Sequence, residues 1–263
     1  MTKKKRLQFL CVMDRLEKLD PEWDNSLAVL GELARRGHET WAADVPDIWA
    51  EGNAILGSCR KIRQKGEEFF TSAPRTFNLA RFNLILIRKE PPVNHAYIAL
   101  TRLLEKTART VPVMNDPAGI RNNNEKLSIL NFPEWIPKTI VTSSPAEILQ
   151  FQKRLKRTVI VKPMDQKGGR GIFLIHSASP SARARLLKAT HRGRETLMAK
   201  EFIQSGKKIE KRIVLLCGKV LAVYEKGRKE RNSARIWGWA QRFILQKYPR
   251  GKGLSCAGCG LIY

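Results

Sequence analysis

The first 122 residues alternate between short apolar runs and amphipathic segments. Continuous apolar runs are typical of buried strands, and apolar positions three and four residues apart are typical of helices. Strands are predicted at residues 7–13, 39–43 and 82–87, and helices at residues 26–36 and 97–108. This alternation predicts a parallel sheet with crossover helices, with ligands at the carboxyl ends of its strands. The polar, basic segment at residues 57–66 is predicted to be a loop or exposed structure.

The pattern changes after a predicted linker at residues 115–124. Ser144 followed by Pro145 is a typical helix start, which predicts a helix to about Lys156. A further helix is predicted at residues 181–190, and strands at residues 158–161, 172–175, 197–202, 211–217 and 220–224. The last two strands flank Gly218-Lys219, a two-residue hairpin signal. This second part is therefore predicted to be an α+β unit.

The most informative segment joins the strands predicted at residues 158–161 and 172–175. Lys162 there precedes a loop that contains Gly168, Gly169 and Gly171. Glycines allow successive backbone N–H groups to approach anionic oxygens, and the lysine adds a positive charge. The loop matches neither G-x-x-x-x-G-K-[ST] nor G-x-G-x-x-G. It is either a phosphate-binding loop between antiparallel strands or a glycine-rich turn without a ligand.

The composition is that of a globular protein. With 263 residues, of which 43% are hydrophobic, the chain is long enough for about two domains. Its five cysteines are odd in number and mostly isolated, which favours a reducing compartment, and we expect a cytoplasmic protein. The apolar stretch at residues 7–13 is too short for an export signal. No run approaches the roughly 18 apolar residues of a membrane span, so no membrane partner is expected.

The net charge of +25 is the main argument for a competing function, nucleic-acid binding. A chain with this charge attracts polyanions non-specifically at low salt. Its basic residues are dispersed, however, and no zinc-finger spacing, basic zipper region or aromatic RNA-binding signature is present. Specific recognition of nucleic acid is therefore not expected, and most of these charges are expected to be solvated surface.

Two further segments carry a family resemblance. Residues 115–127 read Asn-Asp-Pro-Ala-Gly-Ile-Arg-Asn-Asn-Asn-Glu-Lys-Leu, and residues 84–92 read Leu-Ile-Leu-Ile-Arg-Lys-Glu-Pro-Pro. With the glycine loop, and in the same order, they resemble the prokaryotic glutathione synthetases, which are ATP-grasp ligases. The chain has Glu90 where the family has Asp, and Gln166 where the family has glycine. The resemblance runs from Met13-Asp14 to about residue 225.

The resemblance implies an α/β fold with two domains and a tail. A Rossmann-like, parallel-sheet domain at residues 1–122 would bind the peptide substrate. An α+β ATP-grasp domain at residues 123–230, incomplete at its C-terminal end, would bind the nucleotide. Residues 231–263 would be an atypical tail.

The resemblance also implies roles for individual residues. Nucleotide contacts are implied for Lys126, Lys162, Gly168, Gly169, Gly171, Glu201, Ile203 and Glu210. Within this set, the segment at residues 200–203 would line the adenine. Arg88 and Arg212 are expected to bind substrate carboxylates, because a planar guanidinium donates two parallel hydrogen bonds. Arg212 is also expected among the cations that support catalysis. A surface ion pair remains the alternative for each arginine.

The implied reaction joins γ-glutamylcysteine and glycine through an acyl phosphate formed with ATP. Cations must offset the repulsion between a carboxylate and a triphosphate, and the family uses Mg²⁺ beside its lysines. The family's acidic Mg²⁺ ligands are missing here, because Glu230 is the only carboxylate side chain from Arg228 to Tyr263. No metal-ligating residue is therefore predicted. The pair Cys256 and Cys259 lacks a second pair, so it is interpreted as accidental.

A change of reading frame would explain the tail. Residues 232–240 read Asn-Ser-Ala-Arg-Ile-Trp-Gly-Trp-Ala. With one codon choice, the same nucleotides read out of phase encode Glu-Phe-Arg-Thr-Asn-Leu-Gly-Leu-Gly, and the family has Arg-x-Asn-Leu followed by glycines there. We therefore hypothesise a frameshift near Glu230 or Arg231.

Three functions stay open from the sequence. The first is an ATP-dependent ligase of the glutathione synthetase type, with γ-glutamylcysteine and glycine as substrates and a homo-oligomer as a possible assembly. The second is a nucleotide-binding fragment without catalysis, and the third is a basic nucleic-acid binder. A relative that makes glutamate-tailed products by the same chemistry is a variant of the first, although the motif at residues 88–92 favours glutathione.

Overall fold

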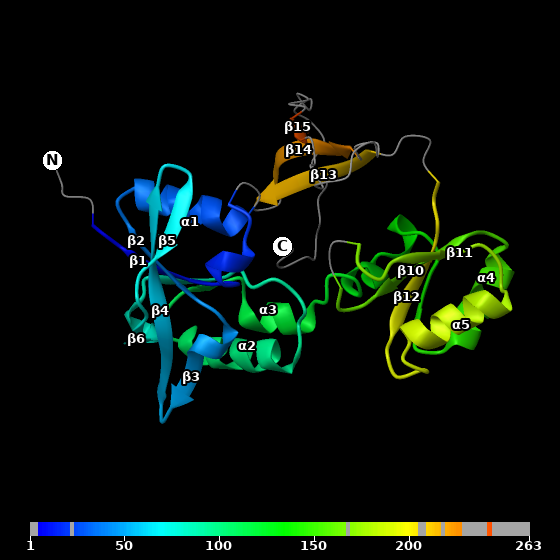
Figure 1. Cartoon of the computed structure of the whole chain (residues 1–263), viewed down its shortest axis with the longest axis horizontal. Helices are drawn as coiled ribbons and strands as arrows, with labels where there is room; N and C mark the ends of the chain where they lie inside the picture. The colour runs from blue at the N-terminus through cyan, green and yellow to red at the C-terminus, as the bar shows by residue number, and fades with distance from the viewer. Residues whose placement is uncertain are drawn as a thin grey trace. The chain divides into compact units, whose positions relative to one another are not determined.

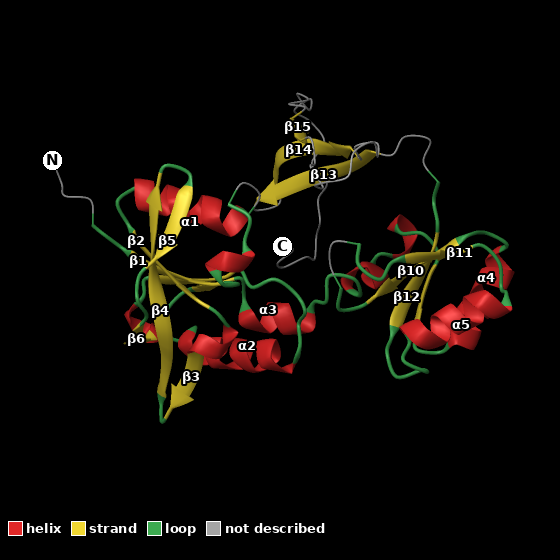
Figure 2. Ribbon diagram, in the orientation of Figure 1, coloured by secondary structure: helices red, strands yellow, loops and turns green. Residues whose placement is uncertain are grey.

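The computed structural model in Figure 1 describes residues 5–21, 24–166, 169–204, 209–216, 219–227 and 241–243. The chain falls into two compact units, Met1–Phe202 and Ile203–Tyr263. Strands are described in both units, and helices are described only in the first (Figure 2).

The N-terminal part of the first unit contains one mixed sheet. Its strands are β1 (Gln8–Val12), β2 (Glu39–Ala43), β3 (Ile48–Glu51), β4 (Ala54–Lys65), β5 (Glu68–Thr71), β6 (Arg75–Asn78), β7 (Leu84–Ile87) and β8 (Val113–Met114). Among the described residues the order is β3-β4-β2-β1-β7-β8, and β5 and β6 pair with β4. Strands β2, β1, β7 and β8 are parallel, which confirms the predicted parallel sheet.

Two helices cover opposite faces of this sheet. They are α1 (Asn25–Arg35) and α2 (His95–Thr107). Leu10 of β1 belongs to the buried cluster that includes Leu100 of α2, whereas Cys11 belongs to the cluster that includes Leu27 of α1. Successive side chains of a strand point to opposite faces, so β1 is apolar on both sides because a helix covers each face.

Two sequence predictions in this part were wrong. Residues 57–66 were expected to be a loop or exposed structure, but residues 54–65 form β4, which pairs antiparallel with β2. The linker predicted at residues 115–124 contains a helix, α3 (Pro117–Asn122). Asp116 caps it by accepting a hydrogen bond from the Gly119 N–H at 2.5 Å, and Pro117 occupies its first turn. An Asp-Pro pair is a helix-start signal, so α3 could have been predicted.

A second sheet follows in the same unit. It consists of β9 (Thr139–Thr142), β10 (Val159–Pro163), β11 (Phe173–Ile175) and β12 (Leu197–Glu201), in the order β11-β10-β12-β9. The helices α4 (Pro145–Leu155) and α5 (Pro180–Ala189) pack on one face, as Figure 1 shows. The buried residues between helices and sheet are Ile148, Phe151, Val159, Val161, Phe173, Ile175, Leu186, Leu197 and Ala199.

The other face of this second sheet is defined by the alternate residues. It carries Ile160 and Lys162 of β10 and Met198 and Lys200 of β12, and we call it the lysine face. Ile160, Lys162 and Lys200 are half-buried, whereas Met198 is buried. The two faces therefore differ in chemistry: the buried side chains between the helices and the sheet are apolar, and the lysine face combines two apolar side chains with two amines.

The second unit contains a three-stranded antiparallel sheet among its described residues. The order is β13 (Ile209–Leu216), β14 (Lys219–Gly227) and β15 (Gln241–Phe243). The pairing of β13 with β14 confirms the two strands predicted around Gly218, although residues 217–218 lie outside the described residues. Strand β15 was not predicted.

Two cysteines are described, and both are buried free thiols, Cys11 and Cys59. Burial raises the pKa of each thiol to about 12, so both stay protonated near neutral pH. Over the described residues, no helix has the length and apolar character needed to cross a membrane.

Candidate nucleotide site

The glycine loop joins β10 to β11, as predicted. The two strands pair antiparallel, with Val161 opposite Phe173. Gly169 and Gly171 have φ of +79° and +68°, a region that glycine adopts without a steric cost. A Cβ on Gly171 would also lie 2.8 Å from Cγ of Pro163. Gly168 lies outside the described residues, so its predicted role stays a prediction.

Lys126 lies against the start of this loop. Its Nζ donates hydrogen bonds to the backbone oxygens of Met164 at 3.1 Å and Gln166 at 3.0 Å, and forms an ion pair with Glu125 at 2.9 Å. Asn124 holds the Lys126 backbone by accepting its N–H at 2.9 Å. The structure thus brings Lys126 to the loop that begins just after Lys162, although the two lysines come from separate segments of the chain.

Lys162 projects from the lysine face near the carboxyl end of β10. It is opposite Met198 in the pairing of β10 with β12, and Lys200 is opposite Ile160. Burial lowers the pKa of Lys200, and the positive charge of Lys162 lowers it further. Anionic phosphate oxygens would relieve this repulsion, since an opposite charge favours the protonated form of a lysine.

The segment predicted to line the adenine lies at the end of β12. The Glu201 N–H donates to the Lys138 backbone oxygen at 2.9 Å, so this group is engaged. The Glu201 carboxylate accepts a hydrogen bond from Arg157 at 2.8 Å. An adenine contact at Glu201 would therefore use other groups than this N–H. Ile203 is 67% exposed and is the first residue of the second unit.

Arg88 follows directly after β7, at the carboxyl end of the parallel sheet. Its N–H donates to the Val12 backbone oxygen at 2.8 Å, and its Nε donates to Ser26 Oγ at 3.3 Å. No ion pair joins Arg88 to another described residue. This position agrees with the expected binding of ligands at strand ends, and the predicted role in carboxylate binding stays a prediction.

The remaining predicted site residues belong to the second unit. Arg212 is exposed on β13, opposite Tyr224 of β14. Glu210 belongs to the same strand, but its side chain lies outside the described residues. The predicted roles of Glu210 and Arg212 stay predictions.

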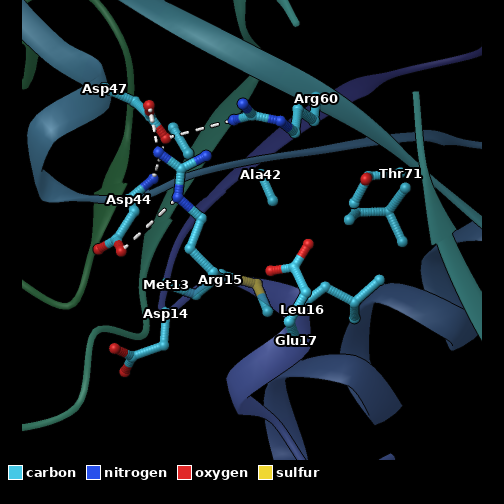
Figure 3. A pocket seen from close by; sticks show the side chains of 12 residues that line it. Met13, Asp14, Arg15, Leu16, Glu17, Ala42, Asp44, Asp47, Arg60 and Thr71 are labelled. Atoms are coloured by element: carbon cyan, nitrogen blue, oxygen red, sulfur yellow. Dashed lines mark hydrogen bonds and ion pairs between the residues drawn. The ribbon is translucent and has the colours of Figure 1, made fainter. Parts of the chain in front are cut away.

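A pocket at the carboxyl ends of β1 and β2 is lined by other residues, which include Asp14, Arg15, Asp44 and Asp47 (Figure 3). Arg15 lies between two carboxylates in it, 2.8 Å from Asp47 and 4.0 Å from Asp44, and Arg60 lies 3.6 Å from Asp47. Lys89 forms ion pairs with Asp44 at 3.0 Å and with Asp14. Because its acids and bases neutralise one another, this pocket offers little unpaired charge to an anion such as ATP.

The described residues do not form a magnesium site. Within those parts of the chain, no three Asp, Glu, His or Cys side chains converge in a way that could hold a metal ion. The lysines and the positive-φ glycines, by contrast, fit a polyphosphate, because both supply hydrogen-bond donors to anionic oxygens.

Comparison with solved structures defines the class of protein. An ATP-grasp RimK domain protein from Sphaerobacter thermophilus matches with a TM-score of 0.54 and 18% identity, over 82% of this chain and 71% of that one. At this identity the likeness concerns the fold alone. The chain has an ATP-grasp fold, which agrees with the predicted fold class.

Sequence comparison defines the family. The N-terminal domain of prokaryotic glutathione synthetase matches residues 7–121, and the ATP-grasp domain of the same family matches residues 125–234. The glutathione synthetase of Gloeobacter violaceus is 37% identical over 221 residues, 81% of this chain and 68% of that protein. That of Parasynechococcus marenigrum is 30% identical over 245 residues, 92% of this chain and 79% of that protein. The chain belongs to the prokaryotic glutathione synthetase family.

Proposed function

We propose that this chain is an ATP-dependent ligase that joins γ-glutamylcysteine and glycine to form glutathione. The observation that carries the proposal is the contact of Lys126 with the loop that begins after Lys162. Two cations and two positive-φ glycines thereby gather at one loop, which suits a triphosphate. Membership of the glutathione synthetase family supports the choice of substrates.

The reaction that we propose has two steps. A carboxylate oxygen of γ-glutamylcysteine attacks the γ-phosphorus of ATP, the bond to the β–γ bridging oxygen breaks, and ADP leaves. The glycine amine then attacks the carbonyl carbon of the acyl phosphate, phosphate leaves, and the nitrogen loses a proton. Lys126 and Lys162 would offset the charge on the phosphates, and Arg88 and Arg212 would bind substrate carboxylates.

The proposal is tested with the purified full chain. We expect phosphate release from ATP that requires both γ-glutamylcysteine and glycine, with glutathione detected by mass spectrometry. Lys162→Ala should abolish turnover and weaken ATP binding. Lys153→Ala, which changes an exposed lysine of α4, is the matched control and should behave as the wild type.

Other outcomes identify the competing functions. ATP binding without turnover under any substrate combination would indicate a nucleotide-binding fragment without catalysis. Failure of the wild type to bind ATP would reject both the ligase and the nucleotide-binding fragment.

A further inference from the structure

Lys200 is a second lysine on the face that carries Lys162. Residues directly opposite each other in an antiparallel pair share a face, as do residues two apart on one strand. Lys162 is opposite Met198, and Lys200 is opposite Ile160, so both amines leave the sheet on the lysine face. They are diagonal neighbours, whose Cα atoms typically lie about 7–8 Å apart, within reach of two long side chains.

The two amines repel each other without a counter-charge. Neither amine forms an ion pair or a hydrogen bond with another described residue. Both side chains are half-buried, and the pKa of Lys200 is lowered by burial and by the charge of Lys162. Holding two like charges in such a place is costly unless an anion joins them.

The position of Lys200 along the sheet fits a nucleotide. The glycine loop begins after Pro163, which is opposite Leu197, and the far end of β12 is Glu201. Lys200 lies two strand positions farther from the loop than Lys162 does. This displacement is about 7 Å along the strands, towards Glu201. A nucleotide with its phosphates at the loop and its base beyond Glu201 would pass over Lys200.

We propose that Lys200 is a further nucleotide-binding residue, whose ammonium group shares one phosphate of the nucleotide with that of Lys162. The inference rests on the proposed function. A phosphate fits better than the base edge, because lysine only donates hydrogen bonds and adenine presents an amino donor beside its N7 acceptor. One phosphate between the two ammonium groups would also turn their repulsion into two attractions.

Binding measurements on the full chain test this role. We expect Lys200→Met to weaken the binding of ATP and of inorganic tripolyphosphate by about 10- to 100-fold, as for the loss of a charged hydrogen bond. Because the substitution removes a repelled, half-buried charge, Tm of the unliganded protein should stay unchanged or rise. Lys153→Met on α4 is the matched control and should change neither affinity.

The results that would overturn the role of Lys200 differ from the result that would overturn the proposed function. Unchanged ATP affinity in Lys200→Met would overturn the inference while leaving the ligase proposal intact. Weaker ATP binding with unchanged tripolyphosphate binding would assign Lys200 to the base and would also overturn it, as would a large fall in Tm. A wild type that does not bind ATP would instead overturn the proposed function.

Proton uptake provides a second readout. A bound phosphate would raise the lowered pKa of Lys200, so ATP binding at alkaline pH below the ordinary lysine pKa of 10.5 should take up protons. Calorimetric titrations in two buffers of different ionisation enthalpy measure this uptake, and it should decrease in Lys200→Met. Equal uptake in the variant and the wild type would contradict the inference.

Discussion

At the scale of single residues, the amine of Lys126 is the contact that organises the candidate site. It donates to two loop carbonyls and is only 16% exposed at the side chain. We expect Lys126→Met to lower ATP affinity by roughly 10- to 100-fold, because a charged donor is lost to both the loop and the phosphates. Calorimetry measures the affinity, and amide hydrogen exchange of the loop should also become faster.

The matched control for Lys126→Met is a substitution of Glu125, the ion-pair partner of Lys126. Glu125 is 66% exposed, so Glu125→Gln removes an exposed ion pair and keeps both bonds to the loop. It should bind ATP within about twofold of the wild type. Equal affinities for Lys126→Met and Glu125→Gln would show that the contact with the loop does not matter for the nucleotide.

Two glycines of the loop allow a comparison of backbone conformation with steric contact. Gly169 and Gly171 both have positive φ, but only a Cβ on Gly171 would meet another residue, Pro163, at 2.8 Å. Alanine at either position should cost about 1–2 kcal/mol through its φ. Gly171→Ala should cost more, because Pro163 must also move. Urea unfolding measures both, and an equal or larger loss for Gly169→Ala would contradict this account.

The sequence could predict which residues are candidates for the site, but not the contacts that these residues make. Motif and resemblance select Lys126, Lys162 and the glycines as candidates. The bonds from Lys126 to Met164 and Gln166 join residues 38 and 40 positions apart, and no local pattern encodes them. Lys200 was noted only as part of the adenine segment, because its repulsion with Lys162 depends on the register of β10 and β12.

At the scale of elements, the strands buried on both faces were predicted well and the long strand β4 was missed. The strand predicted at residues 39–43 agrees with β2 in both bounds. In β4 the buried positions include Ile55, Gly57 and Cys59, which alternate correctly but are mostly small. Arginine and lysine at positions 60, 61 and 63 then make the segment look polar. Because the buried residues are mostly small and their neighbours are long and charged, the alternation of apolar and polar positions that predicts a strand was not recognised.

Glu39 ties three elements of the same sheet together. Its carboxylate accepts hydrogen bonds from Gln8 of β1 at 2.9 Å and Lys61 of β4 at 3.0 Å. The bond from Lys61 has the largest effect on the pKa of Glu39 and lowers it, and this outweighs burial, which raises the pKa. A carboxylate with a lowered pKa stabilises the fold fully above its ordinary pKa of 4.5. That stabilisation is lost as the pH falls through the folded-state pKa.

Glu39→Gln should therefore change the pH profile of stability. At pH 7 we expect a loss of about 1 kcal/mol in the free energy of unfolding, because a charged hydrogen bond becomes neutral. Below pH 4.5 the curves of the variant and the wild type should converge. Urea unfolding from pH 7 to pH 3 measures this, with Glu51→Gln, an exposed residue of β3, as the control. A constant difference at all pH values would contradict the role of the carboxylate.

At the scale of the whole molecule, the domain boundaries predicted at residues 122 and 230 stay a prediction. The hypothesis of a frameshift concerns residues that mostly lie outside the described parts of the chain. The family match extends to residue 234, which includes the position proposed for the change of frame. In the second unit the sequence predicted β13 and β14 but not β15, because β15 has only three residues and pairs with β14, which is distant along the chain.

The net charge of +25 belongs to the whole molecule and leads to the last prediction. We expect the chain to bind duplex DNA at low salt with no preference for sequence, because dispersed lysines and arginines release counterions from any phosphate backbone. Fluorescence anisotropy with two unrelated duplexes should give equal affinities, and the logarithm of the association constant should fall linearly with the logarithm of salt concentration. Lys162→Ala should change the DNA affinity little, although we expect it to weaken ATP binding. Sequence preference that persists at about 0.15 M salt would instead support the nucleic-acid function.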